Sequence, residues 1–170
     1  MTNVDKNLAE ALLKAIRAER DGNSFYMMAA QSTGDAKGKQ IFETLAKEEL
    51  DHMNFLTLQY NSLLRTGAID LTAKFGPRLD LSDSWPIFSE SIKTRIKASH
   101  YEMSALSIGA QLEYDAMLFY KHQAETVASA EAKKFFAELA EWETGHYNAL
   151  ISQQQSLKED YWADSGFAPF

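Results

Sequence analysis

Two copies of the pattern Glu-x-x-His are the residues of this sequence best suited to chemistry. The first runs from Glu49 to His52 and the second from Glu143 to His146. Residues three apart on an α-helix lie on the same face, so a carboxylate and an imidazole with this spacing can bind one metal ion. A further glutamate precedes each copy by 30 residues: Glu19 and Glu113. These six side chains are the predicted metal ligands.

The six residues belong to an internal repeat with an offset of 94 positions. Laid on the second half of the chain without a gap, the first half pairs Glu19 with Glu113, Glu49 with Glu143 and His52 with His146. The same offset pairs Phe25-Tyr26 with Phe119-Tyr120 and Phe42 with Phe136. Two amphipathic helices often match at Ala and Leu, but not at Glu, His and Phe-Tyr together. The repeat therefore predicts two similar helical hairpins.

The candidate ligands lie within apolar stripes. Residues 42, 45, 49, 52 and 56 step by three and four, as do their repeat mates, so the ligands are expected to face the core. An alternative, in which Glu19 and Glu113 are solvated surface carboxylates, is disfavoured by their place on the apolar stripe. Four buried carboxylates need compensation, and two divalent cations bring four positive charges. Oxygen and imidazole donors suit iron and manganese, and the absence of Cys excludes thiolate ligands from this chain.

The spacing of apolar residues predicts an all-α protein with four helices, over 4–31, 36–65, 101–127 and from 129 or 130 to 158. Short turns join the first two and the last two, so each pair should form an antiparallel hairpin. About 35 residues separate the pairs, enough to cross the bundle lengthwise as in ferritin-like four-helix bundles. Ser84 and Pro86 favour the start of a short extra helix over 86–97 within this crossover.

The chain of 170 residues fits one domain, with residues 1–160 as the di-metal bundle. The aromatic tail 161–170 is expected to pack on the bundle or on a partner subunit. A net charge of −7 disfavours nucleic acid as a partner. The sequence contains no run of about 18 apolar residues, so no membrane-spanning helix is predicted. The polar N-terminus is unlike a signal peptide, and a cytoplasmic protein is therefore expected.

The segments around the ligands resemble the di-iron domain of rubrerythrins, within the ferritin-like superfamily. They are residues 19–26, 45–52, 113–120 and 139–146, and the resemblance extends over about 8–157. It implies two iron ions that react with peroxide or O₂, although manganese or a mixed pair would suit the same donors. By this resemblance Glu49 and Glu143 bridge the metals, Glu19 and Glu113 each hold one metal terminally, and one histidine binds each ion: His52 and His146.

Two departures from the family pattern affect the expected activity. Rubrerythrins with a rubredoxin module carry four further cysteines, and this chain has none. Peroxidase rubrerythrins place an extra glutamate one turn after the third helix's ligand, where this chain has Ala116, with Gly22 as its repeat mate. The ligand set is closer to the ferroxidase centres of bacterioferritins. We expect a di-iron oxidoreductase of peroxidase or ferroxidase type, acting in oxidative stress or iron detoxification; the alternative is a non-catalytic iron-binding or storage protein.

Further expectations concern the surroundings of the ligands. Tyr26 and Tyr120 lie seven residues after a ligand glutamate, where a hydroxyl could orient a ligand; the alternative is a packed aromatic side chain. Glu48 and its unlike repeat mate Trp142 are expected to point away from the ligand face. Gly22 and Ala116 should leave room beside the metals, so that leucine at either position keeps both metals bound but slows oxidation. The expected partners are O₂ or H₂O₂, an unidentified electron donor and a second copy of the chain in a homodimer.

Overall fold

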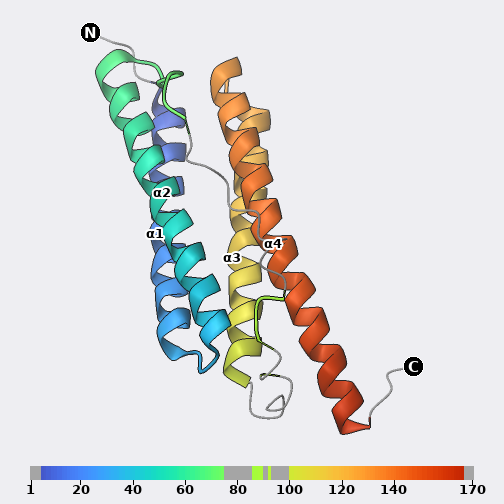
Figure 1. Cartoon of the computed structure of the whole chain (residues 1–170). Coiled ribbons are helices and arrows are strands. Elements are labelled where there is room, and N and C mark those ends of the chain that lie inside the picture. The colour runs from blue at the N-terminus through green and yellow to red at the C-terminus, as the bar shows by residue number, and fades with distance from the viewer. Residues whose placement is uncertain (1–4, 75–85, 90–91, 93–99, 167–170) are drawn as a thin grey trace.

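The structure is a computed structural model that describes residues 5–74, 86–89, 92 and 100–166. Its four helices are α1 (Lys6–Ser32), α2 (Ala36–Thr66), α3 (His100–Thr126) and α4 (Ala130–Ser165). In Figure 1, α1 and α2 pack antiparallel as one hairpin and α3 and α4 as a second. The prediction of an all-α, four-helix protein built from two helical hairpins is confirmed.

Local sequence explains where the helices begin and end. Asp5, Asp35 and Ser129 precede α1, α2 and α4, and each accepts a hydrogen bond of 2.8–3.2 Å from a backbone N–H two or three residues further on. Such caps satisfy backbone donors that lack a partner within the helix. Gly67 and Gly166 follow α2 and α4 at φ 80° and 65°, a left-handed conformation that glycine adopts without a steric penalty.

The core consists of two apolar clusters with the candidate ligands between them. On α1, the residues from Leu8 to Ala15 belong to one cluster and those from Tyr26 to Ala30 to the other, with Glu19 in the intervening turns. The other three helices change clusters in the same way at Glu49, Glu113 and Glu143. The bundle therefore holds one polar layer at mid-height, enclosed by apolar packing above and below.

The connection between the hairpins is described near both ends of the bundle. α2 ends and α3 begins at opposite ends (Figure 1). Asp70 follows α2 closely and is bound to the side chain of Gln59 on that helix. The Asp70 N–H donates a hydrogen bond of 2.8 Å to Gln59 Oε1, and Gln59 Nε2 donates one of 3.1 Å to the Asp70 carbonyl oxygen. Toward the start of α3, Ile87 and Phe88 are buried, and the Ile87 N–H donates to Gln153 Oε1 at 2.5 Å. These contacts agree with a crossover along the bundle.

The predicted short helix over 86–97 is not seen. Residues 86–88 form bends, and Ile92 is in a 3₁₀ turn whose N–H donates to the Ser89 carbonyl oxygen at 3.1 Å, so none of the described residues in this stretch is α-helical. The Ser89 N–H bonds to another element, since it donates to Asp35 Oδ1 at 3.1 Å. Residues 90–91 and 93–97 lie outside the described residues, as does the proposed cap Ser84.

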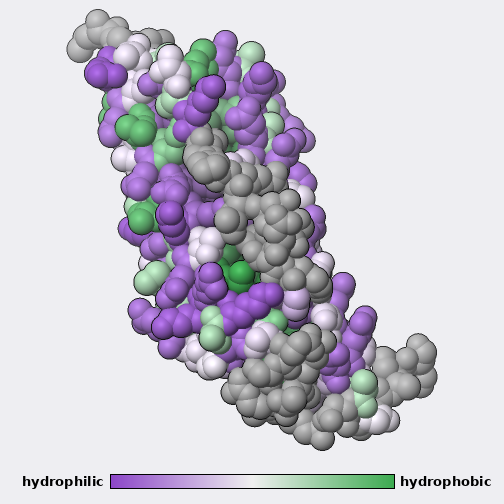
Figure 2. Space-filling model, in the orientation of Figure 1, coloured by the Kyte–Doolittle hydropathy of each residue, from purple (hydrophilic) through white to green (hydrophobic). Residues whose placement is uncertain are grey.

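α4 is longer than predicted, because it continues to Ser165 instead of ending at residue 158. Residues 161–165 of the expected tail are thus helical, and Lys158 Nζ lies 4.9 Å from the centre of the Trp162 ring. Residues 167–170 lie outside the described part, so tail packing stays a prediction. The face in Figure 2 is predominantly hydrophilic over the helices. None of the described helices has the length and apolar character needed to cross a membrane.

Candidate metal centre

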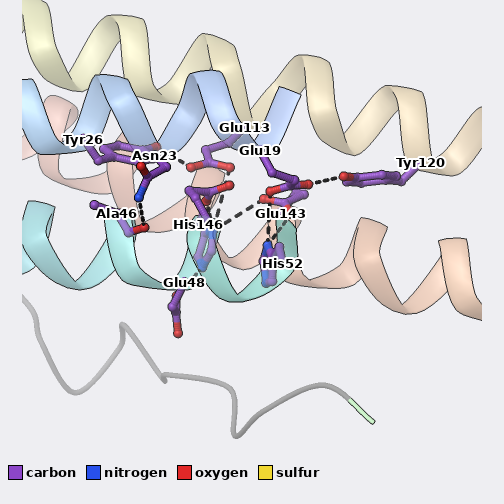
Figure 3. Close-up of polar contacts among 11 residues, drawn as sticks. Glu19, Asn23, Tyr26, Ala46, Glu48, His52, Glu113, Tyr120, Glu143 and His146 are labelled. Carbon is purple, nitrogen blue, oxygen red and sulfur yellow. Dashed lines mark hydrogen bonds and ion pairs between the residues drawn. The ribbon is translucent and has the colours of Figure 1, made fainter. Parts of the chain in front are cut away.

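The six predicted ligands meet in the polar layer of the bundle. α1 and α3 contribute one glutamate each, while α2 and α4 contribute one Glu-x-x-His pair each. All six side chains are buried, with exposed fractions of 0–4%. Figure 3 shows five of them converging between the helices: Glu19, His52, Glu113, Glu143 and His146. The alternative that Glu19 and Glu113 are surface carboxylates is wrong.

The donor atoms form two overlapping groups among the described residues. In each group, one donor atom per residue lies within 4.8 Å of every other. The first group contains four residues: Glu49, Glu113, Glu143 and His146. The second contains three: Glu19, Glu49 and His52. Glu49 is common to both, as a bridging ligand would be.

Glu143 also faces both groups. Its Oε1 lies 3.3 Å from His52 Nδ1, and its Oε2 lies 3.4 Å from His146 Nδ1. Glu19 and Glu113 each approach one imidazole: Glu19 Oε2 is 3.3 Å from His52 Nδ1, and Glu113 Oε2 is 3.7 Å from His146 Nδ1. The cluster therefore divides into two halves, each with one histidine that approaches one carboxylate of its own.

Burial and mutual repulsion make the metal-free cluster retain protons. Burial raises the pKa of Glu49 well above its usual range, and the charges of Glu113, Glu19 and Glu143 raise it further. Burial and the Glu143 charge raise the pKa of Glu113 to about 8. Burial alone would lower the pKa of His52, but its contacts with Glu143 and Glu19 outweigh burial and raise it to about 10. Metal ions that bind here must displace these protons.

Glu143 behaves in the opposite way because both imidazoles surround it. Burial would raise the pKa of its carboxyl group, but the contacts with His146 and His52 hold that pKa well below its usual range. The central carboxylate is thus ionised when its neighbours are protonated. Two bound cations would replace the imidazolium charges as its counterions.

The residues present fit a pair of divalent metal ions. Among the buried atoms of the described residues that make no hydrogen bond are four from the candidate ligands: Glu49 Oε1, both carboxylate oxygens of Glu143, and His146 Nδ1. Buried polar atoms in folded proteins are nearly always paired, so these atoms call for a ligand. Carboxylate and imidazole donors without thiolate are typical of iron and manganese sites.

Tyr26 and Tyr120 connect the two hairpins through the ligands. The fully buried Tyr26 hydroxyl donates a hydrogen bond to Glu113 Oε1, and the Tyr120 hydroxyl donates one to Glu19 Oε1 (Figure 3). Burial and neighbouring carboxylates raise the pKa of both phenols well above 10, so both remain donors. Each ring also stacks on a phenylalanine ring: the centroids of Tyr26 and Phe42 are 6.2 Å apart, and those of Tyr120 and Phe136 are 6.1 Å apart. The structure thus has both the expected hydroxyl contact with a ligand and the packed aromatic ring of the alternative. A role of the two tyrosines in catalysis stays a prediction.

The sequence interpretation was wrong for Glu48 and Trp142, which both touch the ligands. Glu48 is 8% exposed, and its Oε2 lies 2.7 Å from His146 Nε2. The Trp142 ring meets the His52 ring edge-on, with 5.0 Å between centroids. A signal was present in the spacing, because Leu45, Glu48 and His52 also step by three and four.

A cavity of about 330 Å³ lies beside the ligands, between α1 and α3. Gly22 and Ala116 both line it together with Glu49, as the sequence predicted. Gly22 has a second role: a Cβ at this position would lie 3.3 Å from Glu49 Oε2. A larger residue there presses on a ligand, so leucine at Gly22 cannot be expected to leave the metal site undisturbed. Ala116 is the cleaner position for filling the cavity.

The fold and the site together define a four-helix protein whose buried Glu and His groups suit a di-metal carboxylate centre. Residues 10–153 match the family model described as Rubrerythrin, and the chain belongs to the rubrerythrin family. A similar solved structure is "Hypothetical Protein Pfu-1136390-001" from Pyrococcus furiosus, 26% identical, with a TM-score of 0.63. The match covers 92% of this chain and 94% of that chain. A search of curated proteins gave no match.

Proposed function

We propose that this chain binds two iron ions and is a di-iron oxidoreductase that uses H₂O₂ or O₂ as its oxidant. The observation that carries the proposal is the pair of overlapping buried donor groups, which share Glu49. Glu143 lies between them, since its two oxygens are 3.3 Å from His52 Nδ1 and 3.4 Å from His146 Nδ1. In the proposed assignment Glu49 and Glu143 would be shared by the two ions, while Glu19 with His52 would hold one ion and Glu113 with His146 the other. Manganese or a mixed pair would suit the same donors. Bound iron would supply electrons for reduction of the oxidant.

The protein's own residues prepare the site for a small oxidant. Phenol hydroxyls from the opposite hairpins hold one oxygen of Glu19 and one of Glu113. The second oxygens then remain directed at the histidines and at the shared centre. The adjoining cavity of about 330 Å³ is ample for O₂ or H₂O₂. Its lining includes Ala116 at the position where peroxidase rubrerythrins carry a glutamate, which favours ferroxidase-type activity.

The test combines metal stoichiometry with rapid mixing. Metal-free protein loaded anaerobically with Fe(II) should bind two ions per chain. Stopped-flow mixing with O₂, and separately with H₂O₂, should oxidise the bound iron faster than free Fe(II) in the same buffer. Two bound ions that react no faster than free iron would indicate the non-catalytic binding or storage alternative. A single zinc ion held outside the six residues would refute the metal assignment.

The proposal includes an electron donor that is still to be identified; the 170 residues contain no cysteine that could hold iron in a rubredoxin-type centre. A role in oxidative stress or iron detoxification follows from the proposed substrates. A cytoplasmic location and a homodimer remain predictions. Light scattering during size-exclusion chromatography would test the dimer, and fractionation of the native host would test the location.

A further inference from the structure

The two halves of the centre differ at a pair of repeat-equivalent residues that contact the candidate histidine ligands. Glu48 on α2 and Trp142 on α4 are 94 positions apart, like every matched ligand pair. Glu48 lies behind His146, and Trp142 lies beside His52. The nearly symmetric ligand set is therefore surrounded asymmetrically.

Glu48 fixes the orientation of the His146 ring. Its Oε2 is 2.7 Å from Nε2, while Nδ1 on the other side of the ring lies 3.4–3.7 Å from oxygens of Glu143, Glu49 and Glu113. A neutral imidazole carries one N–H, and its other nitrogen has the lone pair. A proton on Nε2, donated to Glu48, leaves the Nδ1 lone pair directed at the donor cluster. This is the arrangement in which a carboxylate orients a metal-binding histidine.

More candidate donor atoms come together around His146 than around His52. The group around His146 has four members within 4.8 Å of one another, whereas the group around His52 has three. Trp142 supports His52 by an edge-on ring contact, which restrains the ring by packing. Glu48 instead makes a directional hydrogen bond to a specific ring nitrogen.

We propose that the two metal positions are inequivalent, and that Glu48 is the positioning residue that makes the His146 position fill first. The inference rests on the proposed function only in requiring two metal positions. It assigns to Glu48 no direct contact with metal or oxidant. Its effect is on the free energy of orienting His146, since a ring held in place before binding loses less freedom when the metal arrives.

Titration of the metal-free protein with Co(II) tests the inference. Calorimetry and visible absorption should show two equivalents, the first bound more tightly. Crystals given less than one equivalent should show anomalous density between Glu113, Glu143 and His146. Fewer than two equivalents in wild type would overturn the proposed function and this inference together. Two equivalents of equal affinity, or first density beside His52, would overturn the inference alone.

Two variants separate positioning from general loss of structure. Glu48→Leu should weaken the first equivalent about 10- to 100-fold, the usual cost of losing such a partner, and change the second less than twofold. Glu48→Gln should recover much of the lost affinity because its amide oxygen still accepts from Nε2–H. Glu43→Leu, at an exposed site on the same helix, should match wild type. Equal weakening of both equivalents, or a Gln variant no better than Leu, would refute positioning by this hydrogen bond.

Discussion

Removal of the metals is expected to make the stability of this protein fall as pH rises. The pKa of Glu113 is raised from its ordinary 4.5 to about 8 by burial and by the charge of Glu143. A raised folded-state pKa means that the folded protein holds a proton which the unfolded chain releases. The stabilisation is complete below about pH 4.5 and is lost as pH rises through about 8.

The neighbouring groups act in the same direction over this range. The pKa of His52, raised to about 10 by contacts with Glu143 and Glu19 that outweigh burial, adds stability below about pH 6.5 that is lost toward pH 10. The pKa of Glu49 is also raised, chiefly by burial. Glu143 has a lowered pKa, so its contribution is present above about pH 4.5 and is lost only in stronger acid.

The size of the effect follows from the linkage relation. Each pH unit between the unfolded and folded pKa values is worth about 1.4 kcal/mol. Between pH 5.5 and 8.0, Glu113 alone should cost the metal-free protein about 3 kcal/mol of unfolding free energy. For a chain of this size, that lowers the melting midpoint by about 6–12 °C. Metals bind the folded form and add about 2.7 kcal/mol per site when the free metal concentration is 100 times Kd. Because protons compete with the metals for the same side chains, the difference between the melting midpoints of loaded and metal-free protein should narrow in mild acid.

The assay is thermal unfolding followed by circular dichroism at constant ionic strength. Chelator-treated and metal-loaded protein are melted in parallel at pH 5.5, 6.5 and 8.0. Glu113→Gln should flatten the pH dependence of the metal-free form, while Glu43→Gln, at an exposed site on α2, should preserve it. A metal-free wild type that melts as high at pH 8.0 as at pH 5.5 would show that these carboxylates are not buried together.

Two further predictions concern the surroundings of the centre, and a third concerns the packing at the start of α2. Tyr26→Phe and Tyr120→Phe each remove a hydrogen bond to a buried carboxylate. Each variant should lose about 1.5–3 kcal/mol of unfolding free energy, measured by urea denaturation. A variant with the unfolding free energy of wild type would contradict the contact. Ala116→Leu should keep two irons bound but slow oxidation by O₂ in stopped flow, and a wild-type rate would mean that the oxidant enters elsewhere. Gly38→Ala puts a Cβ against the Phe88 ring inside van der Waals distance and should cost about 1–3 kcal/mol; an unchanged melting midpoint would argue against this packing.

The sequence predicted the helices well where periodicity and end signals agreed. Three helices begin and end within about two residues of the prediction. α4 was underestimated because residues 159–165 contain neither glycine nor proline, and the helix continues until Gly166. The short crossover helix was expected from local capping signals alone. In the structure, the backbone donors of Ile87 and Ser89 bond to Gln153 and Asp35, so tertiary contacts override the local preference.

The repeat predicted which six side chains come together, because helical spacing determines which face a residue occupies. It could not predict which oxygen faces which imidazole, since that depends on how the hairpins are rotated against each other. For the same reason, the contacts of Tyr26 with Glu113 and of Tyr120 with Glu19 could not be foreseen. Glu48 lies at the edge of the apolar stripe, where spacing alone does not decide between the core and the solvent.

The arrangement of contacts implies that the metal centre and the packing of the two hairpins depend on each other. Tyr26 and Tyr120 link α1 with α3 in both directions, and Glu48 links α2 to His146 on α4. Every one of these hydrogen bonds joins one hairpin to the other and ends on a candidate ligand. Apolar packing stabilises the bundle on either side of the polar layer, but within that layer the hairpins meet chiefly through charged groups. Since unbalanced buried charge is strongly destabilising, binding of two cations should fix the hairpins in register at the level where the chemistry occurs.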